Sequence, residues 1–152
     1  MNKQGKPDLL AKNNALMPRY EELARVFDNP HDDEYPKSEA ERAKFLRSME
    51  KLFQQGYVGG CVHLAEIFAY DTQFKNLEKS YFYFNVMAAY TGHFCVKFNN
   101  HSKDPNFYQG KDRDFRTIPI VAQIIDGIGV IAALRIDIEA YQFRQSLEQM
   151  GL

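Results

Sequence analysis

Apolar residues recur three and four positions apart along most of this 152-residue chain, and glycines interrupt the pattern. One such run lies within residues 8–28. Another, near the C-terminal end, consists of Ile131, Leu134, Ile138 and Tyr141. This spacing places apolar side chains on one face of an α-helix, whereas a strand would alternate them. The sequence therefore predicts an all-α fold.

Capping residues and prolines give approximate boundaries for the first helices. Ser38 and Glu41 match a capping box, in which each side chain accepts a hydrogen bond from a backbone N–H that the helix leaves unpaired. Pro18 is expected to divide residues 8–28 into a short turn of helix and a longer helix, because proline is tolerated in a first turn.

Glycines are expected to end or break the later helices. We expect helices over residues 58–70 and 77–91, and Gly92 should end the second of them. In the apolar region near the C-terminus, Gly127 and Gly129 should kink or break the helix.

Two of the predicted helices match each other at a fixed offset. Gly56 and Gly92 stand 36 positions apart, and each follows one of these helices. The apolar residues that align at the same offset are Phe45 with Tyr81, Leu46 with Phe82, Leu52 with Ala88, and Phe53 with Ala89. Self-similarity at this period is typical of α/α repeat proteins, in which one helix pair buries its apolar face only against neighbouring pairs.

Residues 50–94 carry the small and apolar positions of one such repeat. The matching residues are Gly56, Gly60, Cys61, Leu64, Ala65, Phe68, Ala88, Ala89, Gly92 and His93. With them the segment resembles a Sel-one-like repeat, a relative of the tetratricopeptide repeat. The sequence departs from the family at residues 71–76, which lack the usual glycine-containing turn, and at Ser80, where the family commonly has alanine.

The resemblance implies a short, capped α/α superhelix. We expect one all-helical domain over residues 1–152, with the clear repeat at about 50–94. The helices at 8–28 and 117–149 would then cap the two ends of the stack, because a single helix pair cannot bury its own apolar face.

Composition and charge exclude several classes of protein. Net charge is −1, with 19 basic and 20 acidic residues and no basic cluster, so we expect no nucleic-acid partner. No run of about 18 apolar residues occurs, so we expect no membrane span. Cys61 and Cys95 are too few for a disulfide framework or a zinc site. With the polar N-terminal residues 1–8, they favour a reduced, cytoplasmic location, or a periplasmic one if a signal peptide has been removed.

The residues that could carry catalysis are dispersed. His63 and Glu66 are three positions apart on a predicted helix, a spacing that can present two metal ligands, but a third ligand is not evident. His93 follows Gly92 and is interpreted as a turn residue. We therefore predict a protein that is not an enzyme and that binds no metal or cofactor. A small enzyme using His63, Glu66 and His93 remains the alternative.

The polar segment 99–116 is the best candidate for contact with a partner. Its candidate residues are Phe107, Tyr108, Lys111, Arg113 and Phe115. Aromatic rings beside mixed charges suit a protein partner, because rings supply binding energy and charges supply orientation. A loop with no binding role is the alternative.

Four consecutive aromatic residues, at positions 81–84, surround a helix instead of following one face. They are therefore either covered by flanking helices or partly exposed as a binding patch. Tyr83 is the candidate partner-binding residue if part of the run is exposed.

The resemblance to Sel-one-like repeats implies a protein that works by binding another protein. Such proteins are generally adaptors, and small bacterial ones can be immunity proteins for secreted toxins. We expect an immunity or inhibitor protein that neutralises a cognate bacterial toxin by occluding it. The alternatives are a regulatory adaptor or chaperone-like scaffold that binds a peptide, and the small enzyme named above.

Overall fold

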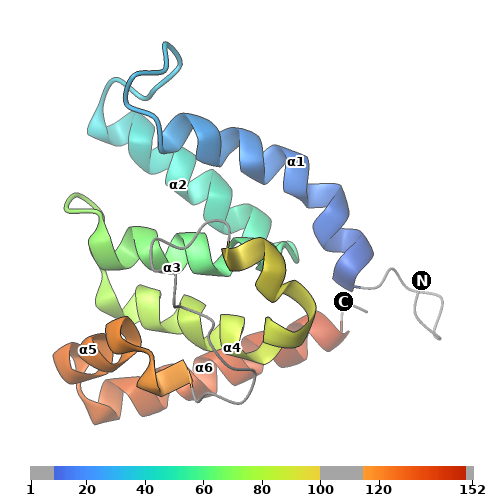
Figure 1. Ribbon diagram of the computed structural model, residues 1–152, viewed down its shortest axis with the longest axis vertical. Helices are drawn as coiled ribbons and strands as arrows, with labels where there is room; N and C mark the ends of the chain where they lie inside the picture. Colours follow the sequence, from blue (N-terminus) through green and yellow to red (C-terminus); the bar gives the residue numbers. More distant parts are fainter. Residues whose placement is uncertain (1–8, 100–114, 150–152) are drawn as a thin grey trace. The chain divides into compact units, whose positions relative to one another are not determined.

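The computed structural model describes residues 9–99 and 115–149, with side chains for residues 11–88 and 115–149, and all regular structure in these residues is helical (Figure 1). The α-helices are α1 (Leu9–Phe27), α2 (Glu39–Gln54), α3 (Cys61–Tyr70), α4 (Leu77–Asn99), α5 (Pro119–Ile128) and α6 (Val130–Gln149). Two 3-10 turns, η1 (Val58–Gly60) and η2 (Phe115–Thr117), precede α3 and α5. The predicted all-α fold is confirmed for the described residues. The Sel-one-like superhelix stays a prediction.

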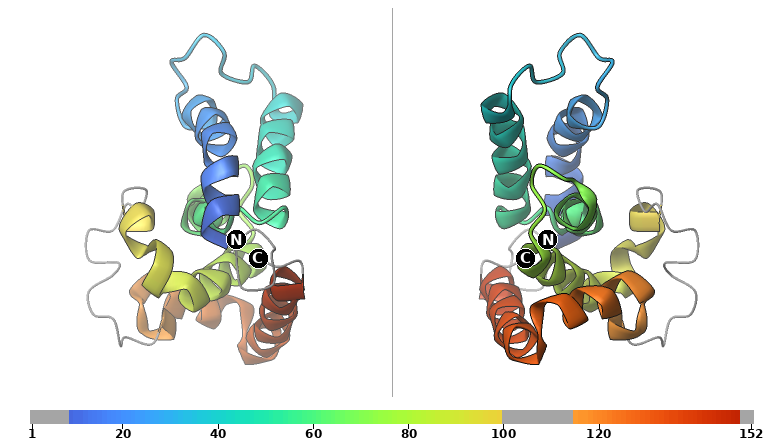
Figure 2. Two further views of the ribbon diagram at one scale, coloured as in Figure 1. Left: turned by 90° about the vertical axis from the view of Figure 1, so that its right-hand side faces the viewer. Right: turned by 90° about the vertical axis from the view of Figure 1, so that its left-hand side faces the viewer.

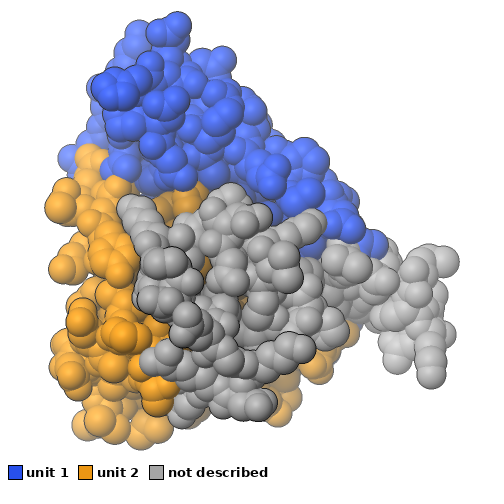
Figure 3. Space-filling view, in the orientation of Figure 1, with its two compact units in different colours: residues 1–60, 149–152 blue, residues 61–148 orange. Residues whose placement is uncertain are grey.

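The contacts of the chain divide it into two compact units, which Figure 3 colours separately. Unit 1 comprises residues 1–60 and 149–152, and unit 2 comprises residues 61–148. The single domain expected over residues 1–152 stays a prediction, and each unit is described by itself.

Unit 1 is a helical hairpin in which α1 and α2 run side by side (Figures 1 and 2). The predicted capping box starts α2: Ser38 Oγ accepts a hydrogen bond from the Glu41 backbone N–H at 3.1 Å. In return Glu41 Oε2 accepts one from the Lys37 N–H at 3.0 Å. The apolar core of the hairpin consists of Tyr20, Leu23, Val26, Phe27, Leu46, Met49 and Phe53.

Pro18 lies inside α1 and does not divide it, so the predicted break there is wrong. Both sides of the proline are fixed to the turn that follows α2. Before it, buried Asn13 donates to the Gly56 carbonyl at 2.8 Å and accepts from the Gly59 N–H at 2.8 Å. After it, the ring of Tyr20 packs on Tyr57 at 4.8 Å. A proline costs about 3 kcal/mol inside a helix, and these anchors on either side offset that cost.

Unit 2 is built on the pairing of α3 with α4, which lie side by side in Figure 1. Most of α3 is buried, including Leu64 and Ala65. Ser80, buried on α4, donates its hydroxyl hydrogen to the Ala65 carbonyl at 2.7 Å. A small residue at position 80 allows this close approach, and the hydroxyl gives the carbonyl a second hydrogen-bond donor.

Gly56 and Gly92 behave differently, although the sequence aligns them. Gly56 follows α2 with a φ of 118°, a left-handed conformation that favours glycine. Gly92 lies inside α4, which continues to Asn99, so the predicted end of the helix at Gly92 is wrong. An interior glycine costs only about 1 kcal/mol, which a helix of 23 residues can accommodate.

The predicted break near the C-terminus is confirmed and falls at Gly129. This glycine ends α5 with a φ of 87°, and its N–H donates to the Ile125 carbonyl at 2.8 Å. Within residues 9–99 and 115–149, no single helix is long and apolar enough to cross a membrane. Taken together, α5 and α6 meet that test of length and composition only as a pair bent by 114°.

Candidate interaction surface

One face of α6 carries large apolar side chains that the chain leaves exposed. We call this face the α6 stripe, and its residues with their exposed fractions are Val130 (66%), Ile131 (87%), Leu134 (58%), Ile138 (59%) and Tyr141 (54%). These include the four residues whose spacing predicted a helix here. The helix is confirmed, and the same four residues turn out to lie on its exposed side.

A second series of apolar residues forms the buried face of α6. Its members are Ala133, Ile136, Ala140 and Leu147. On the borders of this face, Phe143 meets the ring of Phe82 on α4 at 5.8 Å, edge to face, and Arg135 forms an ion pair with Glu78. Because α6 already has a buried face, the exposed stripe is a second apolar surface. Contiguous exposed apolar surface of this kind marks interaction sites in soluble proteins.

The charged residues that border the middle of the α6 stripe are paired within unit 2, while Arg144 lies over the ring of Tyr141, 5.7 Å from its centre. On one side Arg135 pairs with Glu78 and approaches Glu139 at 3.8 Å. On the other side Asp137 pairs with Arg116 at 3.4 Å. The middle of the stripe is therefore flanked by charges of both signs whose partners lie in the same chain.

Asp137 is also the centre of a polar cluster beneath the edge of the stripe. Its Oδ1 accepts hydrogen bonds from the Tyr81 hydroxyl, at 2.7 Å, and from the Asn85 amide. Tyr81 and Asn85 are both buried. Burial, together with the hydrogen bond to Asp137 and its negative charge, raises the pKa of Tyr81 to about 12. Both carboxylate oxygens of Asp137 are thus engaged, one by α4 and the other by Arg116, and they hold α6 in place.

Phe115 packs against the same cluster. Its ring stacks on that of Tyr81 with the centroids 6.1 Å apart. The guanidinium carbon of Arg116 lies 4.6 Å from the centre of the Phe115 ring, so the cation also covers this ring. Phe115 is half-buried and fastens η2 to α4. The other predicted partner-binding residues of this segment lie outside the described residues; they are Phe107, Tyr108, Lys111 and Arg113.

The aromatic run at positions 81–84 is mainly core. Tyr81, Tyr83 and Phe84 are buried, and Tyr83 stacks on Phe68 of α3 at 5.8 Å. The alternative in which Tyr83 contacts a partner is therefore wrong, because its ring is covered by the chain itself.

The residues considered for catalysis do not form a described site. His63 is half-buried on α3 and Glu66 is buried on the same helix, whereas the side chain of His93 lies outside the described residues. In the part of the chain whose side chains are described, no three His, Cys, Asp or Glu residues come together as a metal site requires. The described residues that align with the repeat pattern are structural: Leu64 and Ala65 are buried and Ala88 is half-buried, while the Ala89 side chain is not described.

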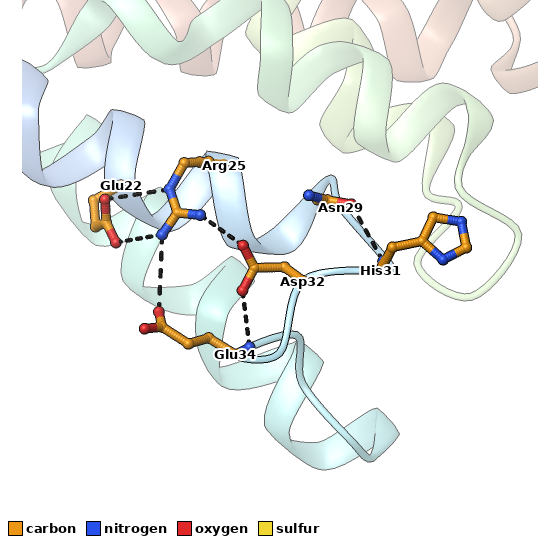
Figure 4. A network of polar contacts seen from close by, with 6 residues as sticks. All are labelled: Glu22, Arg25, Asn29, His31, Asp32 and Glu34. Atoms are coloured by element: carbon orange, nitrogen blue, oxygen red, sulfur yellow. Dashed lines mark hydrogen bonds and ion pairs between the residues drawn. The ribbon is translucent and has the colours of Figure 1, made fainter.

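The acidic loop after α1 is organised by an arginine (Figure 4). Arg25 pairs with Glu22 at 2.8 Å, with Asp32 at 2.6 Å and with Glu34 at 3.8 Å. Asp32 also accepts a hydrogen bond from the Glu34 N–H at 2.8 Å. That backbone bond, and then Arg25, lower the pKa of Asp32. Arg25 thus holds the position that a bound cation would otherwise take, and the network fastens the loop to α1.

Gly60 shows why a small residue precedes α3. A Cβ atom at this position would lie 2.8 Å from the ring of Tyr20, closer than real contacts allow. The group that approaches the Gly60 backbone is thus an aromatic side chain of α1.

No family model, curated protein or solved structure matches the chain. The function is therefore argued from the α6 stripe and its surroundings. Sequence reasoning did not single out this stripe as a surface. The sequence did carry a signal for it. The residues of α6 contain two interleaved apolar series, one of large residues and one containing alanines, whereas a helix with a single buried face needs only one apolar series.

Proposed function

We propose that this chain is a non-catalytic protein-binding module that contacts its partner through the α6 stripe. The observation that carries the proposal is that five large apolar side chains lie side by side on one helix, each more than half exposed. Exposing them to water is unfavourable by roughly 1.5–3 kcal/mol for each side chain relative to full burial. A partner that covers the stripe would recover part of this free energy.

The spacing of the stripe supports a helical partner. Ile131, Leu134, Ile138 and Tyr141 follow the alternating three- and four-residue steps of a coiled-coil seam. Helix-in-groove recognition uses anchors at this spacing. The partner segment we propose is therefore an amphipathic α-helix with an apolar face of matching spacing.

The finer role that we propose is that of an immunity or inhibitor protein. Support for it comes from the resemblance of residues 50–94 to Sel-one-like repeats, in the buried positions Leu64 and Ala65 above all. Occluding a toxin would require a binding surface and no catalytic group.

Site-specific photo-crosslinking in the native cell tests the proposal. A photoreactive residue replaces Leu134 or Ile138 in the stripe, and Ser146, which is exposed on a different face of α6, serves as the matched control. We expect protein adducts at positions 134 and 138 and none at 146. The absence of protein adducts at both stripe positions, or equal adducts at Ser146, would overturn the proposal.

A further inference from the structure

We infer that the helix covering the α6 stripe is the α6 of a second copy of this chain, lying antiparallel to the first across a two-fold axis. This inference rests on the proposed function, because it names the partner of the same surface. Three properties of the stripe carry it: its symmetric spacing, its internally paired charges and its extent.

The spacing of four of the five stripe residues reads the same in both directions. Successive steps from Ile131 through Leu134 and Ile138 to Tyr141 are three, four and three residues. An antiparallel copy therefore sets Ile131 against the partner's Tyr141 and Leu134 against the partner's Ile138. Each of these four apolar side chains meets an apolar side chain, as a two-fold interface between identical surfaces requires. Val130, at the end of the stripe, lies outside this pairing.

The charges at the borders do not prevent pairing with a second copy. Arg135 and Asp137 lie on opposite borders near the middle of the stripe, so in an antiparallel two-fold pair each faces its own counterpart. Such like-charge contacts are normally unfavourable. Here Arg135 is balanced by Glu78, and Asp137 by Arg116, within the same chain. For the same reason a partner with opposite charges would gain little from these residues.

The extent of the stripe indicates a reversible dimer. Five side chains exposed by 54–87% present on the order of 500 Å² of apolar surface per chain. Each partner of a standard stable interface buries about 800 Å². The stripe therefore supplies the apolar centre of a smaller interface, and we expect dissociation in the micromolar range.

Sedimentation equilibrium with paired charge variants tests the arrangement. The wild type should dimerise as its concentration rises through the micromolar range. Leu134→Glu and Ile138→Lys should each weaken dimerisation at least tenfold, because each places a charge against an apolar side chain. An equimolar mixture should recover a heterodimer, since the antiparallel pair sets the carboxylate introduced at position 134 against the ammonium introduced at position 138 of the other chain. Ser146→Glu, on another face of α6, should dimerise like the wild type.

Several results would overturn this inference. A wild type that is monomeric up to several hundred micromolar excludes the second copy, as does a monomer that instead binds phosphatidylcholine vesicles through the stripe. A mixture that fails to recover the heterodimer excludes the antiparallel pairing. Ile131→Ser, at the most exposed position, repeats the single-variant test if a charged variant loses its helical circular dichroism. The dimer and the proposed function can fail independently. A monomeric chain that crosslinks to a different protein through position 134 would contradict the dimer and leave the proposed function standing.

Discussion

The hydroxyl of Tyr81 donates a hydrogen bond to the carboxylate of Asp137 across 2.7 Å, joining two helices whose contacting residues are 56 positions apart. Asn85 donates to the same oxygen, and Arg116 pairs with the other. This contact fixes α6 on α4 by its polar edge. Together with the buried Ala133, Ile136, Ala140 and Leu147, it holds α6 with the stripe on the exposed side.

Removing the Tyr81 hydroxyl should destabilise unit 2. Tyr81→Phe keeps the buried ring but deletes one donor to a carboxylate, so we expect a loss of roughly 1.5–3 kcal/mol in the free energy of unfolding. Tyr141→Phe is the matched control, because Tyr141 is exposed and should change stability by less than about 0.5 kcal/mol. Urea denaturation of both variants measures the difference. Equal midpoints for the two variants would contradict the buried contact.

The raised pKa of Tyr81 gives a prediction for alkaline pH. In the folded chain this pKa is about 12, whereas an unfolded tyrosine titrates at about pH 10. The folded state therefore keeps its proton longer, and the stabilisation from Tyr81 is complete below about pH 10 and lost as pH rises towards 12. Unfolding midpoints measured across this range should converge for wild type and Tyr81→Phe. A constant difference between the two would show that the pKa of Tyr81 is not raised.

Asn13 should be one of the least replaceable polar residues of unit 1. Its amide group satisfies the Gly56 carbonyl and the Gly59 N–H, so Asn13→Ala leaves two backbone groups without this partner. We expect a loss of roughly 2–4 kcal/mol, because a buried polar group that loses its partner costs about 1–3 kcal/mol. Asn14→Ala, at the exposed next position of α1, should be nearly neutral. Thermal melts of the two variants make the comparison.

The loop network around Arg25 should respond to acid. Because the pKa of Asp32 is lowered in the folded chain, its stabilisation is present above the ordinary value of about 4 and is lost as pH falls through the lowered value. The melting temperature of Asp32→Asn should therefore be lower than that of the wild type at pH 6 and close to it at pH 2. Asp33→Asn, which lies outside the network of Figure 4, is the control. An unchanged melting temperature for Asp32→Asn at pH 6 would contradict the prediction.

Periodicity was sufficient to predict the helices but not their ends. Pro18 and Gly92 are local breakers, yet both lie inside helices. For Pro18 the structure gives the reason, since Asn13 and Tyr20 fix both sides of it to the same turn through contacts about 40 residues away in the sequence. Such distant contacts leave no signal in a local pattern, whereas the capping box of Ser38 and Glu41 is local and was predicted.

The candidate site was harder to predict than the fold, for a physical reason. The spacing of Ile131, Leu134 and Ile138 shows that the three share a face, but it does not show what lies opposite that face. Whether the chain covers that face depends on contacts between distant residues. The polar cluster around Asp137 is one example, because its residues come from α4, η2 and α6. Among the residues predicted to contact a partner, Tyr83 is buried because Phe68 of α3 packs on its ring. Four consecutive aromatic residues could not show from the sequence which of them α3 covers.

Comparing two leucine-to-alanine variants tests most directly whether the α6 stripe is a surface for another protein and not part of the core. Leu64 is fully buried on α3, whereas Leu134 is 58% exposed on the stripe. In urea denaturation at sub-micromolar concentration, Leu64→Ala should lose roughly 2–5 kcal/mol by leaving a cavity. Leu134→Ala should change stability by less than about 0.5 kcal/mol. A loss at Leu134 as large as that at Leu64 would place the stripe in the core and contradict the proposed function.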